Sequence, residues 1–221
     1  MEKGKPRDLD NVISLLEETY GTEPWNWHTR QSPFQVLIGT VLSQRTKDSN
    51  TDRAARALFS RYPTPRDLAR ASLGEIEALI RPSNYYRTKA KKIKEISRLI
   101  LEEHSGKTPE SLEELVKLPG VGKKTASCTM LYGHRINCIP CDIHVKVISQ
   151  RLGWATESEP DRIQDELESR LPRKDWCKIN ELLVKHGQAA CFTRNPKCWL
   201  CNITGYCSYP DKRLSPPGRK P

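Results

Sequence analysis

The sequence of 221 residues lacks the features that define several common classes of protein. No apolar run in it approaches the roughly 18 to 20 residues that a membrane-spanning helix needs. The first ten residues, MEKGKPRDLD, are charged from the second position onward and do not resemble an export signal. Internal repeats are absent too. We therefore expect an intracellular protein that is neither secreted nor inserted in a membrane.

Alternation of apolar and polar residues, the pattern of a half-buried strand, is nearly absent as well. Apolar residues recur instead at helical spacing. They form four stripes: Leu9, Val12, Ile13 and Leu16; Ile93, Ile96 and Ile100; Ile163, Leu167 and Leu171; and Ile179, Leu182 and His186. The segment 143–148 fits a strand as well as a helix, but Asp142 before it could cap a helix. We predict an all-α protein whose helices are kept short by frequent Pro and Gly.

Charge is unevenly balanced, with 37 Lys and Arg against 27 Asp and Glu and a formal net charge of +10. Such a surplus suits a polyanionic partner. Nucleic acid is favoured over a membrane surface, because no long basic amphipathic helix with flanking aromatics is present. A run of lysines beside the second stripe is interpreted as a solvated helix face, with contact to DNA as the alternative: Lys89, Lys91, Lys92 and Lys94.

Four cysteines crowd the C-terminal part of the chain: Cys191, Cys198, Cys201 and Cys207. Clustered thiols in a reducing compartment usually hold a metal or a cluster. Zinc sites tend to combine two C-x2-C pairs, or one pair with histidines, whereas this quartet has one pair with a single cysteine at longer reach on each side. The spacing favours a cubane iron–sulfur cluster, and a zinc site is the alternative. The other cysteines, Cys128, Cys138, Cys141 and Cys177, are interpreted as small hydrophobic residues.

The segment LPGVGKKTA, residues 118–126, separates two helical segments at 111–117 and 123–132. Its two glycines allow a tight turn with positive φ and a close approach of the backbone. The second helix then begins with N–H groups that can bind a DNA phosphate without reading the base. An ordinary glycine turn is the alternative interpretation.

Taken together, this hairpin, an aspartate 18 residues beyond its second lysine, and the C-x6-C-x2-C-x5-C loop resemble the endonuclease III family of helix-hairpin-helix DNA glycosylases. The resemblance extends from about residue 32 to residue 207. It implies a two-lobed all-α fold with a [4Fe-4S] cluster. Residues 25–135 would form a helical barrel lobe, and residues 1–24 would join 136–209 in the cluster lobe. Residues 210–221, basic and rich in proline, are expected to be a disordered tail.

The resemblance also implies two catalytic residues. Lys124 matches the family's nucleophile, an amine that forms a Schiff base with the damaged nucleotide. Its place at a helix N-terminus and partial burial would lower its pKa. Asp142 matches the catalytic carboxylate, while His144 is interpreted as structural. Lysine at position 124, rather than the tyrosine or serine of related branches, implies a bifunctional glycosylase and AP lyase. The resemblance as a whole implies that its substrates are oxidised pyrimidines such as thymine glycol.

Double-stranded DNA with a damaged base or an abasic site is the implied partner, bound by a monomer. The residues that match DNA contacts are Gln44, Arg45 and Tyr85 in two inserting segments, Gly120, Gly122 and Lys123 in the hairpin, and Arg194 and Lys197 in the cysteine loop. The bacterial pattern has glutamine at position 45, glycine at 84 and leucine at 85, so damage preference stays open. Another lesion, or a non-catalytic DNA clamp, is the competing interpretation.

Overall fold

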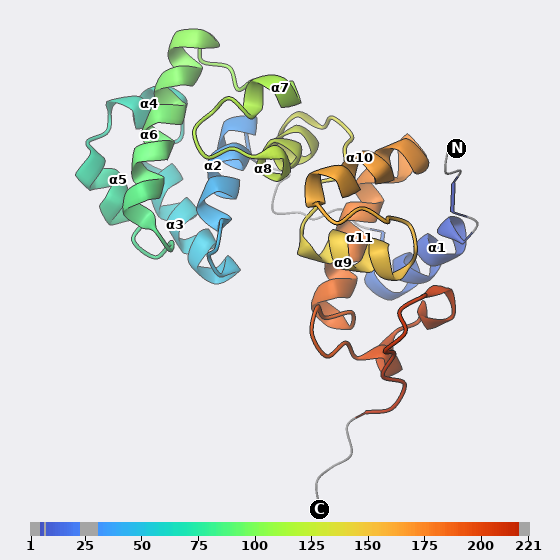
Figure 1. The fold of residues 1–221 in the computed structure, drawn as a ribbon. Helices are drawn as coiled ribbons and strands as arrows, with labels where there is room; N and C mark the ends of the chain where they lie inside the picture. Colours follow the sequence, from blue (N-terminus) through green and yellow to red (C-terminus); the bar gives the residue numbers. More distant parts are fainter. Residues whose placement is uncertain (1–4, 7, 23–30, 217–221) are drawn as a thin grey trace, which may run out of the picture. The chain divides into compact units, whose positions relative to one another are not determined.

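The computed structural model describes residues 5, 6, 8–22 and 31–216 (Figure 1). These residues form helices and connecting loops with no β-strand among them, which confirms the all-α prediction. None of the described helices is long and apolar enough to cross a membrane. The α-helices are α1 (Leu9–Tyr20), α2 (Pro33–Ser43), α3 (Asp48–Arg61), α4 (Pro65–Arg70), α5 (Leu73–Leu79), α6 (Tyr86–Glu103), α7 (Leu112–Leu115), α8 (Lys123–Cys128), α9 (Ile143–Arg151), α10 (Pro160–Arg170) and α11 (Trp176–Ala189).

The chain divides into two compact units. The first, here the cysteine unit, combines residues 1–26 with 137–221 and contains α1 and α9 to α11. The second, here the hairpin unit, consists of residues 27–136 and contains α2 to α8. Trp25, where the sequence analysis begins the barrel lobe, lies outside the described residues.

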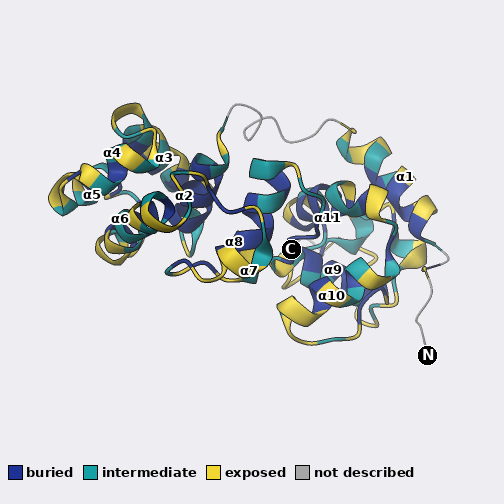
Figure 2. Ribbon diagram, turned by 90° about the horizontal axis from the view of Figure 1, so that it is seen from above, coloured by how far each residue is buried: buried dark blue, intermediate teal, exposed yellow. Residues whose placement is uncertain are grey.

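The hairpin unit is built around α2, which is buried from Val36 to Leu42 and appears almost wholly dark in Figure 2. The helix begins with a capping box, in which Ser32 and Gln35 satisfy each other's backbone N–H groups. The predicted stripe of α6 packs into the same core, because Ile93, Ile96 and Ile100 are fully buried. Helices α4 and α5 also start with capping boxes, so side chains satisfy N–H groups at the start of these short helices.

The cysteine unit joins the two ends of the chain. Helix α1 lies beside α11, although about 160 residues separate them (Figure 1). The predicted stripes of both helices are buried in one core, which surrounds Trp154 at 1% exposure. The Lys178 ammonium adds an ion pair with the Glu17 carboxylate at 2.8 Å.

Asp142 decides the ambiguous segment 143–148 in favour of a helix. Its Oδ1 atom accepts hydrogen bonds from the N–H groups of His144 and Val145, both at 2.9 Å. This is the geometry of an N-cap, and it fixes the start of α9. The helix then packs against α11, where the ring of His144 lies over Gly187.

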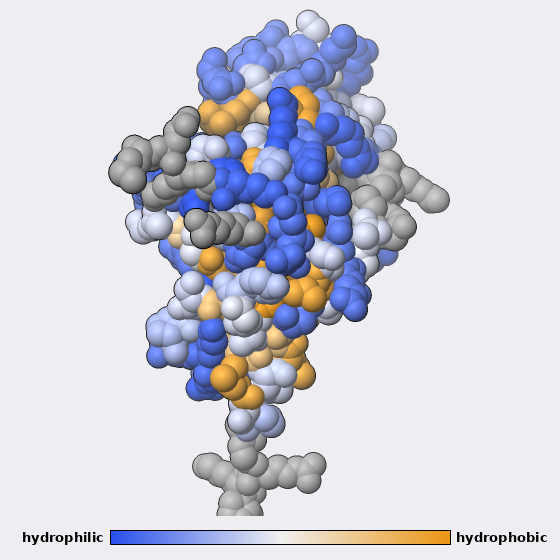
Figure 3. Space-filling model, turned by 90° about the vertical axis from the view of Figure 1, so that its right-hand side faces the viewer, coloured by the Kyte–Doolittle hydropathy of each residue, from blue (hydrophilic) through white to orange (hydrophobic). Residues whose placement is uncertain are grey.

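Most of the face shown in Figure 3 is hydrophilic, with hydrophobic residues in small groups. Among the described residues, six large hydrophobic residues are exposed, and most of them border segments singled out in the sequence: Tyr85, Val116, Ile143, Leu200, Tyr206 and Leu214.

The packing of α9 on α11 generates a stability prediction. A methyl group at Gly187 would clash with the His144 ring, so Gly187→Ala should lower the free energy of unfolding by about 1–3 kcal/mol. Gly39 in α2 is the matched control, since a methyl group there meets no atom within 4 Å. Gly39→Ala should be neutral or stabilise by up to about 1 kcal/mol. Urea denaturation measures both, and an unchanged midpoint for Gly187→Ala would contradict this account of the packing.

Candidate active site and cysteine pocket

The predicted hairpin is formed by α7, the turn 118–122 and α8. Gly120 has φ +79°, so the turn needs glycine there, whereas Gly122 caps α8 with φ −92°. Side-chain space is restricted as well, because a Cβ atom on Gly120 would lie 2.7 Å from Cδ of Lys92. Val121 is buried between the two glycines and anchors the turn in the core. The positive φ predicted for this segment therefore belongs to Gly120 alone.

Lys124 is the second residue of α8, and its side chain is exposed, while Lys123 is half-buried. The helix N-terminal position agrees with the sequence analysis, but the partial burial expected of Lys124 is not found. Lys124 is exposed because it lies on the outer side of the first turn of α8, as Gly122 does. Thr125 and Ala126 occupy the buried side of the helix. Beyond Cys128 the chain continues as a π-helical turn, Thr129–His134.

Asp142, in the cysteine unit, is half-buried at the start of α9. Because its Oδ1 atom accepts both capping hydrogen bonds, the carboxylate is oriented by the helix that it caps. Ile143 beside it is 51% exposed, so the helix start is open to solvent. His144 packs on Gly187, in keeping with its structural interpretation.

The two segments expected to insert into DNA lie side by side in the hairpin unit. Gln44 is half-buried, and its Nε2 atom donates to Gly120 O at 3.0 Å and to Thr125 Oγ1 at 3.2 Å. Its side chain therefore ties the end of α2 to the hairpin. Arg45 is exposed and has φ 53°. Of this pair, Arg45 is the residue that the turn presents to solvent.

Tyr85 stands at the start of α6 with φ 57° and 64% of its side chain exposed. Core packing, the alternative for the tyrosines of this segment, applies to Tyr86, which is partly buried against the core. Asn84 links the two segments, since its Nδ2 atom donates to Arg45 O at 2.6 Å.

Lys89 does not lie on a solvated helix face, so that prediction is wrong for this residue. It is only 5% exposed, and its ammonium group donates to four oxygen atoms, two of them carbonyls of Leu42 and Gln44. Lys94 also points inward and donates to Ala71 O at 2.6 Å, whereas Lys91 is exposed. The missed signal is spacing: position 89 is on the same helical face as 93, 96 and 100.

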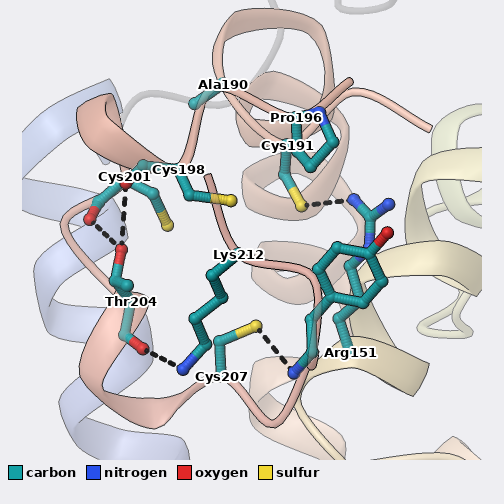
Figure 4. Close-up of a pocket in the computed structure, with 10 residues that line it drawn as sticks. Arg151, Ala190, Cys191, Pro196, Cys198, Cys201, Thr204, Cys207 and Lys212 are labelled. Atoms are coloured by element: carbon teal, nitrogen blue, oxygen red, sulfur yellow. Dashed lines mark hydrogen bonds between the residues drawn. The ribbon is translucent and has the colours of Figure 1, made fainter. Parts of the chain in front are cut away.

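The four cysteines of the C-terminal loop line one pocket, with their sulfur atoms directed into it (Figure 4). Polar atoms approach three of these sulfurs: Arg151 Nη1 lies 3.1 Å from Cys191 Sγ, Tyr209 N lies 3.4 Å from Cys207 Sγ, and His186 Nε2 lies 3.4 Å from Cys201 Sγ. Burial raises the pKa of the Cys191 and Cys201 thiols, so a ligand must displace their protons. Among the described residues, no group of three or more His, Cys, Asp or Glu side chains is placed to hold a metal ion.

Arg151, which the sequence analysis does not identify, braces this pocket. It is 9% exposed, and its guanidinium donates to Phe192 O at 3.0 Å and to Thr193 O at 3.1 Å. The ring of Tyr209 stacks on it at 4.3 Å. The signal in the sequence is weak: Arg151 follows the buried Ile148 at i+3, on the inner side of α9.

The segment after Tyr209 also differs from the expected disordered tail. Lys212 lines the cysteine pocket, and its ammonium donates to Thr204 O at 3.2 Å. Residues 210–216 contain no helix or strand, only turns and irregular backbone, and Lys212 is the contact that joins this segment to the pocket. In the loop itself, Arg194 is exposed, while Lys197 is half-buried with its ammonium 5.2 Å from the Phe192 ring centre.

Comparison with known proteins agrees with this architecture. The family described as HhH-GPD superfamily base excision DNA repair protein matches residues 38–173. Endonuclease III of Thermotoga maritima is 43% identical over 202 residues, which cover 91% of this chain and 94% of that protein. Endonuclease III of Synechocystis sp. is 38% identical over 178 residues, which cover 80% of this chain and 81% of that protein.

Among solved structures, a trapped endonuclease III–DNA covalent intermediate superposes with a TM-score of 0.83 at 27% identity. The match covers 91% of this chain and 94% of that one. Together with the matched family and the identity to the relatives, this likeness shows that the chain belongs to the endonuclease III family of base excision repair DNA glycosylases.

Proposed function

We propose that this DNA glycosylase is bifunctional: it removes oxidised pyrimidines of the thymine glycol type from double-stranded DNA, then cleaves the strand 3′ to the abasic site by β-elimination. The observation that carries the proposal is Lys124, an exposed amine in the first turn of α8, directly after the hairpin. Support comes from the similar endonuclease III that was trapped as a covalent intermediate with DNA.

An amine nucleophile explains both activities. The neutral Nζ atom of Lys124 attacks C1′ of the damaged nucleotide, and the glycosidic bond breaks with its electron pair leaving on the base, which takes up a proton. Loss of the amine proton and ring opening leave a Schiff base. Removal of a C2′ proton then expels the 3′ phosphate. Because Lys124 is exposed in the free protein, it is accessible to a nucleotide that has left the base stack.

We assign Asp142 the role of the carboxylate that stabilises positive charge on the sugar as the base departs. An ionised carboxylate has about four acceptor positions, and the two capping N–H groups use only Oδ1. The Oδ2 atom therefore retains acceptor capacity. Fixing one oxygen at a helix start also limits the orientations of the other, which favours a preorganised charge.

We further propose that Cys191, Cys198, Cys201 and Cys207 hold a [4Fe-4S] cluster. The four cysteines line one pocket without being placed to hold a single metal ion, and a [4Fe-4S] cluster instead takes one cysteine thiolate on each of its four irons. The N–H groups directed at Cys191 and Cys207 suit thiolates bound to iron. When bound, the cluster would supply a structural link rather than reaction chemistry. It would hold the loop that presents Arg194 and Lys197 to the DNA backbone.

The lyase proposal is tested at Lys124. Borohydride reduces a Schiff base to a stable adduct, so the wild-type protein should become covalently linked to a duplex with one thymine glycol. Lys124→Gln removes the nucleophile and should give no adduct, while much of the DNA binding is retained. Lys123→Gln, one position away, should still give the adduct.

Trapping of Lys124→Gln at the wild-type rate would refute the assignment. A wild-type adduct with an abasic duplex alone would keep the lyase and replace thymine glycol by another lesion. No adduct with either duplex would instead favour a protein that only binds DNA.

Two substitutions separate the structural and chemical roles of Asp142. Asparagine is also a good N-cap, so Asp142→Asn should nearly preserve stability but slow single-turnover base release by about 10²–10⁴-fold. Asp142→Ala should show the same slow release and also lose about 0.5–2 kcal/mol of stability. A near-wild-type rate for Asp142→Asn would remove the carboxylate from catalysis.

The cluster is tested by metal analysis of the purified protein. We expect a brown protein with about four iron atoms and four sulfides per chain. Cys198→Ser should lose iron and the visible absorption and should unfold the cysteine loop, as seen by proteolysis. Cys177→Ser, outside the quartet, is the control and should keep both. A colourless protein with stoichiometric zinc would refute the cluster.

A further inference from the structure

Two short segments of the hairpin unit meet at the end of α2. We call them loop 1, residues 44–46, and loop 2, residues 83–85. Direct hydrogen bonds join them: Asn84 Nδ2 to Arg45 O at 2.6 Å, and Asn84 N to Thr46 Oγ1 at 3.1 Å. Ser83 Oγ also donates to Leu42 O at 3.0 Å. The two loops therefore form one connected structure, although 39 positions separate Asn84 from Arg45.

The ammonium group of Lys89 lies at the centre of this structure. It is 2.7 Å from Leu42 O and from Gln44 O, and 2.9 Å from Thr46 Oγ1 and from Ser83 Oγ. A protonated lysine has three N–H donors, so its capacity is fully used. The acceptors come from the end of α2 and from both loops. Lys89 therefore contacts all three at once, and the Ser83 hydroxyl beside it also joins Leu42 O to Thr46 Oγ1.

None of these four acceptors is a carboxylate. The positive charge is balanced by carbonyl dipoles at the C-terminal end of α2, where a helix is negatively polarised. Burial, with Lys92 nearby, lowers the pKa of Lys89 to about 8, so the protonated form still predominates at neutral pH. Helix packing alone would be better served by an apolar residue, because position 89 continues the face of Ile93 and Ile96.

At the outer edge of this structure stand Arg45 and Tyr85. Both are non-glycine residues with positive φ, at 53° and 57°, a conformation that costs roughly 1 kcal/mol each. Contacts on either side hold them there. Asn84 fixes the carbonyl of Arg45, and Lys89 N donates to Tyr85 O at 3.0 Å. The two strained backbone positions thus present the large side chains of Arg45 and Tyr85 to solvent on neighbouring turns.

We propose that Lys89 is a positioning residue that locks loops 1 and 2 into a single wedge, so that Arg45 and Tyr85 enter the DNA duplex together. The proposal rests on the proposed glycosylase function and adds a device for extruding the damaged base. A wedge that is rigid before binding loses little conformational freedom when it replaces a base in the stack.

Extrusion of a paired base costs a few kcal/mol, and less is required where no base is paired. A loosened wedge should therefore slow the capture of a paired lesion much more than the reaction at an abasic site. A residue that merely stabilised the fold would affect both substrates alike. This difference separates positioning from general stability.

The test replaces Lys89 by Met, which keeps the length and the apolar stem of the side chain but removes its donors. We expect single-turnover excision of thymine glycol paired with adenine to slow by about 10-fold or more, the equivalent of losing one or two such hydrogen bonds. Borohydride trapping at an abasic site should stay within about twofold of wild type. Fluorescence of a 2-aminopurine beside the lesion should rise more slowly, because it reports extrusion. Lys91→Met, on the exposed side of the same helix, should leave all three unchanged.

Equal losses on both substrates, or no loss on either, would overturn the positioning role. If Lys89→Met does not fold, Asn84→Ala removes the 2.6 Å link to Arg45 from an exposed residue, and the same selective loss is expected. The same loss at both sites for that variant would also refute the wedge. The wild-type protein must form the adduct at the abasic site. Failure there would refute the proposed function itself, whatever the variants do.

Discussion

Every α-helix leaves about four N–H groups at its start and four carbonyls at its end without partners inside the helix. In a chain of many short helices this requirement falls on a large share of the backbone. Side chains meet it in several places, as at the capping boxes that open α2, α4 and α5. The same requirement is met by two residues to which we assign a function, one in each unit. Asp142 satisfies the start of α9, and Lys89 satisfies the end of α2. Asp142 and Lys89 therefore hold helix ends in addition to the functions that we propose for them.

The cysteine unit meets this requirement differently, because its C-terminal loop has only two 3-10 turns, 198–200 and 204–206. Side chains from distant helices support it. Arg151 of α9 binds two carbonyls of the loop, and His186 of α11 connects Cys201 Sγ with the hydroxyl of Tyr20 on α1, at 3.4 and 2.9 Å. With so little regular structure, the loop depends on these contacts. A ligand bound by the four cysteines would join them from inside the pocket.

The fold could be predicted from the sequence where the signal is local. The four apolar stripes are buried as expected, and the cap at Asp142 correctly favours a helix over a strand. The family could be identified because hairpin, aspartate and cysteine spacing are each local motifs. The contacts of Lys89 could not be predicted from the sequence, because three of its four acceptors lie 43 to 47 positions earlier in the chain. Partial burial of Lys124 is a prediction from the needs of the chemistry rather than from a local pattern, and in the structure this residue is exposed.

The lysines of α6 show why a net charge is a poor guide to a DNA-binding surface. Successive residues of a helix point about 100° apart, so neighbours in one charge run meet different surroundings. Lys89 and Lys94 direct their ammonium groups at backbone carbonyls, Lys92 lies over Gly120 of the hairpin, and Lys91 is exposed. Two of the four charges are thus used within the fold. The surplus of +10 overstates the charge available to a phosphate backbone, and the position of each exposed cation decides where DNA can lie.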